Sequence, residues 1–520
     1  MLILISILFL FVTALALLIL KITRPEFRFA WLTALGGTSL AWLIVLIWQT
    51  QLPLSFTFPS WQPPSLFAAS PALSADGLSW PYAFSLVTLV IAILLTSSVR
   101  EDFPNSYLWS VEIALCGLGL LAITAGNPLT LALAWAALDL SELVTMLRES
   151  ADQQSSERAV VAFSTRAAGI ILLLLANAVS AAAGKPFDFL STPPQAGLLL
   201  LAAAGLRLGV LPLHLPYQSD SSLRRGLGTM LRLVSAASSL ILLARIPTAS
   251  LESPFTPLLL ILSAIAALYG GWMWMRAPDE LTGRPFWMIG LAGLAVASAL
   301  FGDSSGSVGW GVALILAGGA LFLSSLQQIW LNRALWIGAW ALSSLPFSLT
   351  ALGWQNNTSN WGFLLPIFLV AQAFIMTGFV RHALRPSTRT PLSAQPVWAK
   401  TVYPAGIGLL ILLQFLLGFW GWGGALTIGL VPAGIAASLL TLGLLWAMPR
   451  FSFLNPVRAH WIQPTVASRL DRLYQNLWVL YRWLGQLTQS ISDVLEGDGG
   501  IMWTLLFLIF FVLLIAQRKP

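Results

Sequence analysis

The sequence has little charge and a single cysteine. Charged residues make up 9% of its 520 residues and hydrophobic residues 57%. About a quarter of the residues in a soluble globular domain are charged, so the composition excludes that class of protein. The lone cysteine, Cys116, excludes an internal disulfide and a thiolate metal site. The three histidines, His214, His382 and His460, are too scattered to indicate a metal cluster.

The sequence also lacks the motifs of common enzymes. It contains no glycine-rich phosphate-binding loop, no Ser-His-Asp pattern and no set of redox ligands. We therefore predict no catalytic residues, no metal site and no cofactor, and we assign any electron chemistry to partner proteins. The net charge of +7 is explained by membrane topology rather than by binding to nucleic acid.

What the sequence does have is a series of long apolar segments. A helix that spans a bilayer needs about 20 apolar residues, and its backbone groups must be hydrogen-bonded within the segment. This pattern predicts an all-α polytopic membrane protein of about 16 transmembrane helices. The predicted spans are 2–22, 29–49, 78–99, 107–126, 128–147, 158–183, 193–213, 225–246, 254–275, 284–302, 306–326, 332–352, 361–380, 402–422, 424–447 and 501–517.

Lysine and arginine are distributed unevenly between the loops. Numbered from the N-terminus, the odd loops hold most of them, and the even loops hold only Lys185 and Arg245. By the positive-inside rule, the odd loops are cytoplasmic and both termini lie on the outer side. We predict a multi-pass protein of a bacterial plasma (inner) membrane.

The spans and their connections predict five regions. These are 1–106 (three helices with an outer loop over 50–77), 107–400 (the core), 401–447 (two helices), 448–500 (a connector and an amphipathic helix) and 501–520 (a final anchoring helix). In the fourth region, leucines recur at three- and four-residue spacing opposite a polar face. Such a helix lies either along the membrane surface or against a neighbouring subunit.

Two residue types predict details of the span ends. Many of the 24 tryptophans lie near span ends, which indicates anchoring at the membrane interface; they include Trp31, Trp48, Trp80, Trp109, Trp361 and Trp503. Asp76 precedes the span 78–99, where its carboxylate can accept hydrogen bonds from the free amides of a helix start.

A few charged residues lie within or at the edge of the predicted spans. They are Glu112, Asp139, Glu142, Arg166, Arg207 and Arg232. A charge at mid-membrane costs at least ~2.5–3.5 kcal/mol, so such residues pair, face water or serve a function. Together with His214, which follows the span 193–213, they are candidates for a proton or ion path. The alternative is a structural ion pair that joins the predicted helices.

Three local sequences resemble a known family of membrane subunits. They are Ala75-Asp-Gly-Leu-Ser-Trp-Pro, Gly205-Leu-Arg-Leu-Gly-Val-Leu-Pro-Leu-His-Leu-Pro-Tyr and Ser343-Ser-Leu-Pro-Phe-Ser-Leu. In this order and at these distances they resemble the DGLS, GKxAQFPLHxWLP and SLxGIPP stretches of one family. That family comprises the antiporter-like subunits of respiratory complex I and the Mrp-type cation/proton antiporters. The resemblance covers about residues 70–450.

The resemblance implies a fold, partners and a function. The fold would contain two inverted five-helix repeats, each with a helix broken at a proline, here Pro212 and Pro346. The partners would be other membrane subunits of a complex I-like assembly of NADH–quinone oxidoreductase type. The transported ions would be protons or monovalent cations, moved at the expense of a partner's redox energy.

The sequence departs from the family at the residues expected to carry protons. Ala136 stands at the position of a family glutamate, Arg207 and Gly318 at those of two lysines, and Gln355 at that of a further ionisable residue. The guanidinium of arginine has a pKa above ~12 and so stays protonated at neutral pH, whereas a buried lysine can titrate near neutral pH. We therefore predict a degenerate proton path. Two alternatives remain open: a transport-silent scaffold subunit, or the membrane subunit of a proton-driven inorganic-carbon uptake system.

Overall fold

The computed structural model describes residues 1–27, 29–59, 70–99, 105–149, 153–186, 188–215, 225–326, 328–355, 362–385, 392–420, 429–451 and 479. The chain divides into two units, Met1–Pro456 and Val457–Pro520. The predicted amphipathic helix of 448–500 lies almost entirely outside the described residues, and so does the predicted anchoring helix over 501–517.

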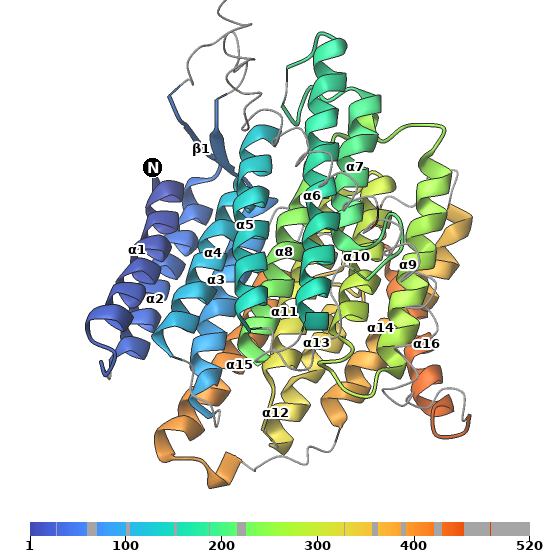
Figure 1. Ribbon diagram of the computed structural model, residues 1–520. Helices are drawn as coiled ribbons and strands as arrows, with labels where there is room; N and C mark the ends of the chain where they lie inside the picture. Colours follow the sequence, from blue (N-terminus) through green and yellow to red (C-terminus); the bar gives the residue numbers. More distant parts are fainter. Residues whose placement is uncertain are drawn as a thin grey trace, which may run out of the picture. The chain divides into compact units, whose positions relative to one another are not determined.

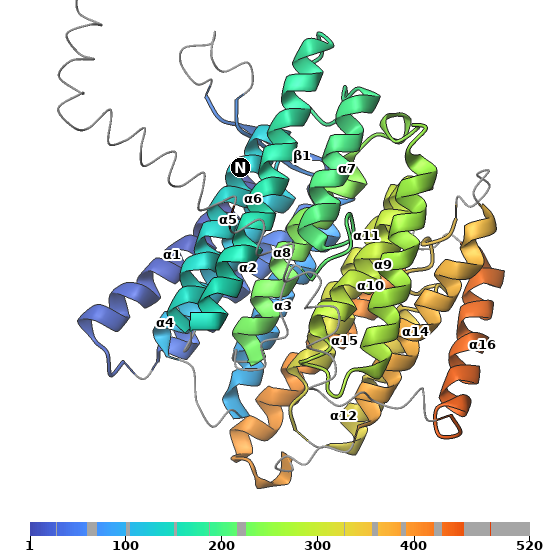
Figure 2. The ribbon, with the colours of Figure 1, turned by 45° about the vertical axis from the view of Figure 1, so that its right-hand side comes forward.

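The described part of the first unit is a set of α-helices that run side by side, with one β-hairpin (Figures 1 and 2). Its elements are α1 (Leu2–Thr23), α2 (Ala30–Trp48), β1 (Leu54–Thr57), β2 (Ala72–Ala75), α3 (Ser79–Thr96), α4 (Ser106–Ile123), α5 (Pro128–Glu149), α6 (Gln153–Ala182), α7 (Pro194–Leu208), α8 (Arg225–Arg245), α9 (Thr256–Arg276), α10 (Arg284–Leu300), α11 (Ser304–Leu323), α12 (Ile329–Ala334), α13 (Trp336–Ala341), α14 (Leu365–Leu384), α15 (Val397–Trp420) and α16 (Val431–Ala447).

The helices confirm the predicted polytopic, all-helical class. Among the described residues, 11 helices are long and apolar enough to cross a bilayer, and α7, α10 and α16 are apolar but shorter. Apolar side chains such as Val12, Ile171 and Leu258 are more than half exposed on the outer helices. An exposed apolar surface of this kind fits a lipid environment rather than water. The number of sixteen spans and the inverted repeats stay predictions.

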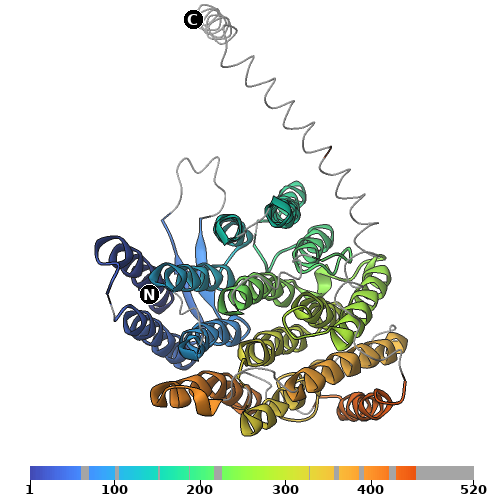
Figure 3. The same ribbon diagram turned by 60° about the horizontal axis from the view of Figure 1, so that its bottom comes forward.

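Four helices form the interior of the bundle. Almost every residue of α3, α8, α10 and α11 is buried. This is expected of α3, α10 and α11, which are largely apolar on all sides, whereas α8 also buries Arg232 and several serines. In Figure 3 many of the helices are seen close to end-on, and α8, α10 and α11 (green to yellow) lie inside the bundle. Helix α8 packs against α4, α7 and α11, so it contacts helices from both the earlier and the later part of the chain.

The predicted outer loop over 50–77 contains a β-hairpin that the sequence analysis missed. Strands β1 and β2 are antiparallel, with Leu54 opposite Ala75. Ser74 N donates a hydrogen bond to Thr124 O, and this bond ties the hairpin to the turn between α4 and α5. Asp76 Oδ1 accepts hydrogen bonds from Leu78 N and Ser79 N, which confirms its predicted role at the start of α3.

The span over 332–352, predicted to be broken at Pro346, is helical over a shorter length than expected. The helices α12 and α13 are short there, and residues 342–355 are non-helical. Ser344 and Phe347 adopt positive φ angles of 56° and 63° on either side of Pro346, which cannot continue a helix. The amide of Gln372 on α14 donates to Leu342 O (2.8 Å) and to Ser344 Oγ (3.1 Å). These bonds satisfy backbone and side-chain groups that would otherwise be unpaired in a dry interior.

The tryptophans near span ends also differ from expectation. Trp48, Trp80 and Trp109 are at most 3% exposed, so interfacial anchoring is wrong for these three. Trp31 is partly exposed, and Trp361 and Trp503 lie outside the described residues. Trp80 Nε1 donates a hydrogen bond to Val45 O on α2, so this indole joins two helices instead of facing the membrane surface. Position near a span end does not reveal whether a side chain points outward or toward a neighbouring helix.

Candidate functional site

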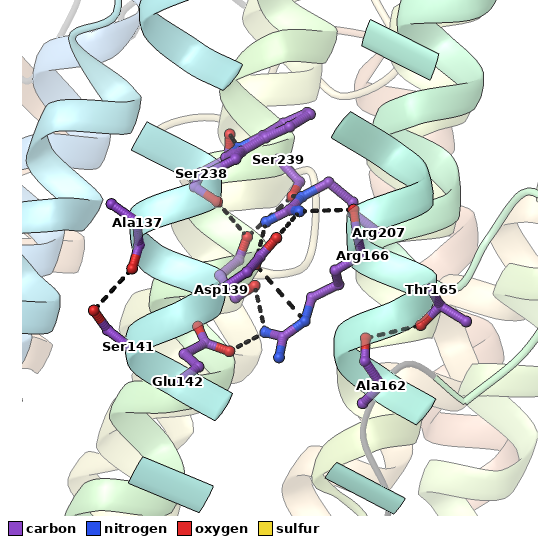
Figure 4. A network of polar contacts seen from close by, with 12 residues as sticks. Ala137, Asp139, Ser141, Glu142, Ala162, Thr165, Arg166, Arg207, Ser238 and Ser239 are labelled. Carbon is purple, nitrogen blue, oxygen red and sulfur yellow. Dashed lines mark hydrogen bonds and ion pairs between the residues drawn. The ribbon is translucent and has the colours of Figure 1, made fainter. Parts of the chain in front are cut away.

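Helices α5, α6 and α7 bring four of the predicted residues together. Asp139 and Glu142 are three residues apart on one face of α5, Arg166 comes from α6, and Arg207 comes from the last turn of α7 (Figure 4). We call these four residues the ion network. It contains two acids and two arginines and is therefore neutral when all four are charged.

Arg207 forms a bidentate ion pair with Asp139. Arg207 Nη1 lies 2.5 Å from Asp139 Oδ2, and Arg207 Nη2 lies 2.8 Å from Asp139 Oδ1. The remaining Arg207 donors reach Ser239 Oγ and the carbonyl oxygen of Arg166, both at 3.2 Å. The ring of Trp135 lies 4.2 Å from the guanidinium carbon. A bidentate pair of this kind is among the strongest polar contacts in proteins.

Arg166 joins the second acid to the first. Its Nη1 donates to Glu142 Oε2, and its Nε lies 3.8 Å from Asp139 Oδ1. Nη1 also reaches Ser235 Oγ on α8 at 3.3 Å. Glu142 is held less completely than Asp139, because its Oε1 is buried without a hydrogen-bond partner among the described residues.

The ion network is closed to solvent. Asp139, Glu142, Arg166 and Arg207 are each at most 3% exposed. Buried charges are tolerated when they are paired, and loss of one partner leaves the other charge uncompensated. Neither arginine can give up its proton, so a proton carried through this region would have to bind a carboxylate. Glu142 is the better acceptor, because one of its oxygens is not engaged.

Two further residues of the predicted ion path are also buried, on helices α4 and α8. Glu112 on α4 is 2% exposed and Arg232 on α8 is 3% exposed. Arg232 Nη1 donates to Gly228 O at 3.0 Å. Arg232 precedes Ser235, which binds Arg166, by three residues on the same helix face.

His214 and Pro212 lie in the turns that follow α7. The helix ends at Leu208 because Gly209 takes a left-handed conformation with φ of 74°. His214 Nδ1 lies 2.9 Å from Pro212 O, and Nε2 is buried without a hydrogen-bond partner among the described residues. Burial lowers the pKa of His214, and the contact with Pro212 O only partly opposes this. Burial therefore favours the neutral form of His214.

The positions aligned with the other family residues carry no ionisable group. A side chain at Gly318 on α11 would meet Trp287, because an ideal Cβ there would lie 2.6 Å from the indole Nε1. That nitrogen donates to Leu314 O at 3.2 Å, so the indole fills the space beside Gly318. Gln355 is exposed at the end of the non-helical segment 342–355.

Sequence reasoning missed several residues that complete these sites. Ser235, Ser239 and Trp135 contact the two arginines of the ion network. The serines in the predicted span 225–246 were the available signal. A second polar group surrounds the segment 342–355, where Trp354 Nε1 donates to Gln372 Oε1 at 3.0 Å. Among the described residues, no group of His, Cys, Asp or Glu is arranged to hold a metal ion.

Comparisons with solved structures show which proteins share this fold. No protein-family model and no curated protein sequence matches the chain. Solved structures do match it. A chain of the Mrp complex from Dietzia sp. DQ12-45-1b aligns with a TM-score of 0.71 and 16% identity, over 100% of this chain and 63% of the Mrp chain.

Two respiratory complexes also contain matching chains. One belongs to the membrane-bound sulfane sulfur reductase, an archaeal respiratory membrane complex, with a TM-score of 0.64, 13% identity, 98% of this chain and 99% of that chain. The other belongs to respiratory complex I from Thermus thermophilus, with a TM-score of 0.60, 18% identity, 80% of this chain and 100% of that chain. At the level of the fold, the resemblance stated from the sequence is confirmed.

Proposed function

We propose that the chain is an antiporter-like membrane subunit of a complex I-related assembly. In this assembly, redox chemistry in partner subunits drives the translocation of protons or monovalent cations, and this subunit contributes a degenerate path. The fold shared with chains of the Mrp complex and two respiratory complexes supports the proposal. The observation that carries it is the buried ion network, because charges at this depth are retained where they function or pair.

The proposed path is confined to the part of the molecule that precedes α9. Its members are Asp139, Glu142, Arg207 and His214, with Glu112, Arg166 and Arg232 as neighbouring charges. Glu142 would take the proton, and the arginines would act as fixed counter-ions that return it to the carboxylate form. Beyond α8, the indole of Trp287 fills the space beside Gly318, where the family places a lysine. We infer that the second part does not relay protons.

The proposal also names the membrane in which the chain lies and the side on which its termini lie. We place the chain in a bacterial plasma membrane, and the uneven distribution of Lys and Arg supports an orientation with both termini on the outer side. Partner subunits would contact the outward-facing apolar helices or the predicted amphipathic helix of 448–500.

The first test is purification of the protein from its native membrane, followed by mass spectrometry of what co-purifies. We expect membrane subunits of a quinone reductase or hydrogenase. A lone protein would contradict the proposal. A single soluble zinc protein as the only partner would also contradict it and would favour the inorganic-carbon uptake system.

A transport-silent scaffold is the second candidate, and the bidentate contact between Arg207 and Asp139 favours it. The two candidates differ in proton pumping by inverted membrane vesicles that contain the assembled complex. If the subunit carries protons, Glu142→Gln slows pumping while the complex still assembles. If it is a scaffold, pumping by Glu142→Gln equals that of the wild type.

A further inference from the structure

Three arginines converge on one face of α8, at the end of the bundle where α8 begins. Arg225 and Arg232 lie seven residues apart on this helix, with Thr229 between them on the same face. Arg284, the first residue of α10, reaches this face, since its Nη1 lies 3.3 Å from Thr229 Oγ1. We call Arg225, Arg232 and Arg284 the arginine cluster.

Arg284 is the buried member without a carboxylate partner among the described residues. It is 1% exposed, and its Nε contacts Leu281 O at 3.3 Å. Its Nη2 is buried and makes no hydrogen bond to the described residues. The ring of Phe322 lies 5.9 Å from its guanidinium carbon and covers one side without supplying an acceptor.

The acids near the arginine cluster are already engaged. Glu280 Oε1 accepts from both Nη1 and Nη2 of Arg225 at 2.9 Å. Asp279 accepts from Leu281 N, Thr282 N and Thr282 Oγ1, which close the turn before α10. Arg225 and Arg232 both lie close enough to repel the charge on Arg284. The opposing attraction of Glu280 and Asp279 is weaker than the effect of burial.

This arrangement requires a counter-ion. Arginine cannot be neutralised by losing its proton, and an uncompensated buried charge is strongly unfavourable. The neutral partners of Arg284, a hydroxyl and a carbonyl, supply partial charge only. The first turn of α10 adds the positive end of a helix dipole at the same place.

We propose that the arginine cluster binds a phosphate group, with Arg284 Nη2 as its central donor. A guanidinium fork matches phosphate geometry, and a helix N-terminus favours an anion. The cluster lies at the end of the bundle whose loops hold most Lys and Arg, where basic groups between membrane helices bind anionic lipid headgroups. The phosphate therefore comes either from an anionic phospholipid or from solution. This proposal is independent of any role in proton transport.

The test compares four forms of the full-length chain: wild type, Arg284→Gln, Asp220→Asn and, as a matched control, Arg333→Gln. Arg333 is an exposed arginine of the short helix α12, at the start of the predicted span 332–352, which the sequence also places at the cytoplasmic end. Melting temperatures are recorded in nanodiscs of phosphatidylglycerol or phosphatidylcholine, and in detergent with inorganic phosphate or chloride at equal ionic strength. Native mass spectrometry counts retained phospholipids.

We expect phosphatidylglycerol or phosphate to raise the melting temperature of the wild type and of Arg333→Gln. Arg284→Gln should bind about tenfold more weakly, the effect of losing one charge-assisted contact. An effect of phosphatidylglycerol alone identifies a lipid headgroup, and an effect of phosphate alone identifies the free ion. If Arg284→Gln does not fold, the melting temperatures of the wild type in the two lipids and with the two anions still test the proposal.

Three results would overturn the proposal. One is a wild type whose melting temperature responds to neither phosphatidylglycerol nor phosphate. Another is an equal response of Arg284→Gln and the wild type. The third is a response to phosphatidylglycerol or phosphate that appears only in Asp220→Asn, because Asp220, which lies outside the described residues, would then be the counter-ion of the wild type.

Discussion

At the scale of single residues, the molecule is governed by the pairing of buried charges. Asp139 is 0% exposed and Arg207 is 2% exposed, and each supplies two atoms to their contact. Neither charge can be hydrated if its partner is removed. Stability at this site therefore depends on keeping or removing both charges together.

The first prediction concerns this pair. Asp139→Asn and Arg207→Gln should each destabilise the protein by about 3–5 kcal/mol, because each leaves a buried charge uncompensated. The double variant should lose less than the sum of the two single variants, since both charges are gone. Chemical unfolding of the four proteins in detergent measures this. Strictly additive losses would show that the two residues do not stabilise each other.

The second prediction concerns pH and His214. Its pKa is lowered in the fold from 6.5, so the unfolded chain takes up the proton first as the pH falls. The contribution of a neutral His214 to stability is therefore complete above pH 6.5 and is lost as the pH falls below it. Unfolding at pH 7.5, 6.5 and 5.5 should show a smaller loss on acidification for His214→Gln than for the wild type. Parallel pH curves for the two proteins would contradict the lowered pKa.

At the scale of elements, close helix packing depends on glycines at a few crossings. Helices α9 and α10 approach each other at Gly270, where an ideal Cβ would lie 2.7 Å from the Cα of Gly290. Backbone atoms cannot rotate away as a side chain can, so this crossing tolerates no larger residue. Gly408 on α15 differs, because an added Cβ there meets nothing within 4 Å.

The third prediction uses these two glycines as a matched pair. Gly270→Ala should destabilise the protein by about 1–3 kcal/mol, because the helices must move apart. Gly408→Ala should be neutral or stabilising by up to about 1 kcal/mol, the difference in helix propensity. Thermal unfolding of both variants measures the contrast. Similar melting temperatures for the two variants would show that α9 and α10 can separate without cost.

The broken helix shows what a span prediction misses at this scale. The apolar run over 332–352 has the length and composition of a span, and Pro346 was identified as a break. The structure leaves 342–355 non-helical, stabilised in part by Gln372 from a helix that follows it in the chain. Hydropathy reports how apolar a segment is, whereas the backbone conformation here depends on a distant side chain.

At the scale of the whole molecule, the two ends of the helix bundle are predicted to face opposite sides of the membrane. The turn between α1 and α2 and the connection between α6 and α7 lie at opposite ends of the bundle (Figure 1). Glu26 in the first and Lys185 in the second are both exposed. The positive-inside rule places the first in the cytoplasm and the second outside.

The fourth prediction is a labelling pattern. In a Cys116→Ala background, Lys185→Cys should react with a membrane-impermeant maleimide on intact cells. Glu26→Cys should react only after the membrane is permeabilised. The background variant without a new cysteine serves as the control. The reverse pattern would invert the topology and would place the arginine cluster on the outer side.

By itself, the sequence determined the membrane class, the approximate limits of most helices and the identity of most of the buried charges, but not Arg284 or Asp303. These follow from local properties: the length of an apolar run, the cost of a charge in lipid and the sign of the loops. The three local motifs also led to a fold that the comparisons confirm.

Only the tertiary structure decided which charges meet. Arg207 pairs with Asp139 and Arg166 with Glu142, while Arg284, which the sequence placed at the start of a span, is buried without a carboxylate partner among the described residues. The tertiary structure also buried Trp48, Trp80 and Trp109 inside the bundle. The physical reason is that pairing and burial depend on how each helix is rotated and where it crosses its neighbours. Those quantities are set by side-chain packing between segments far apart in the chain.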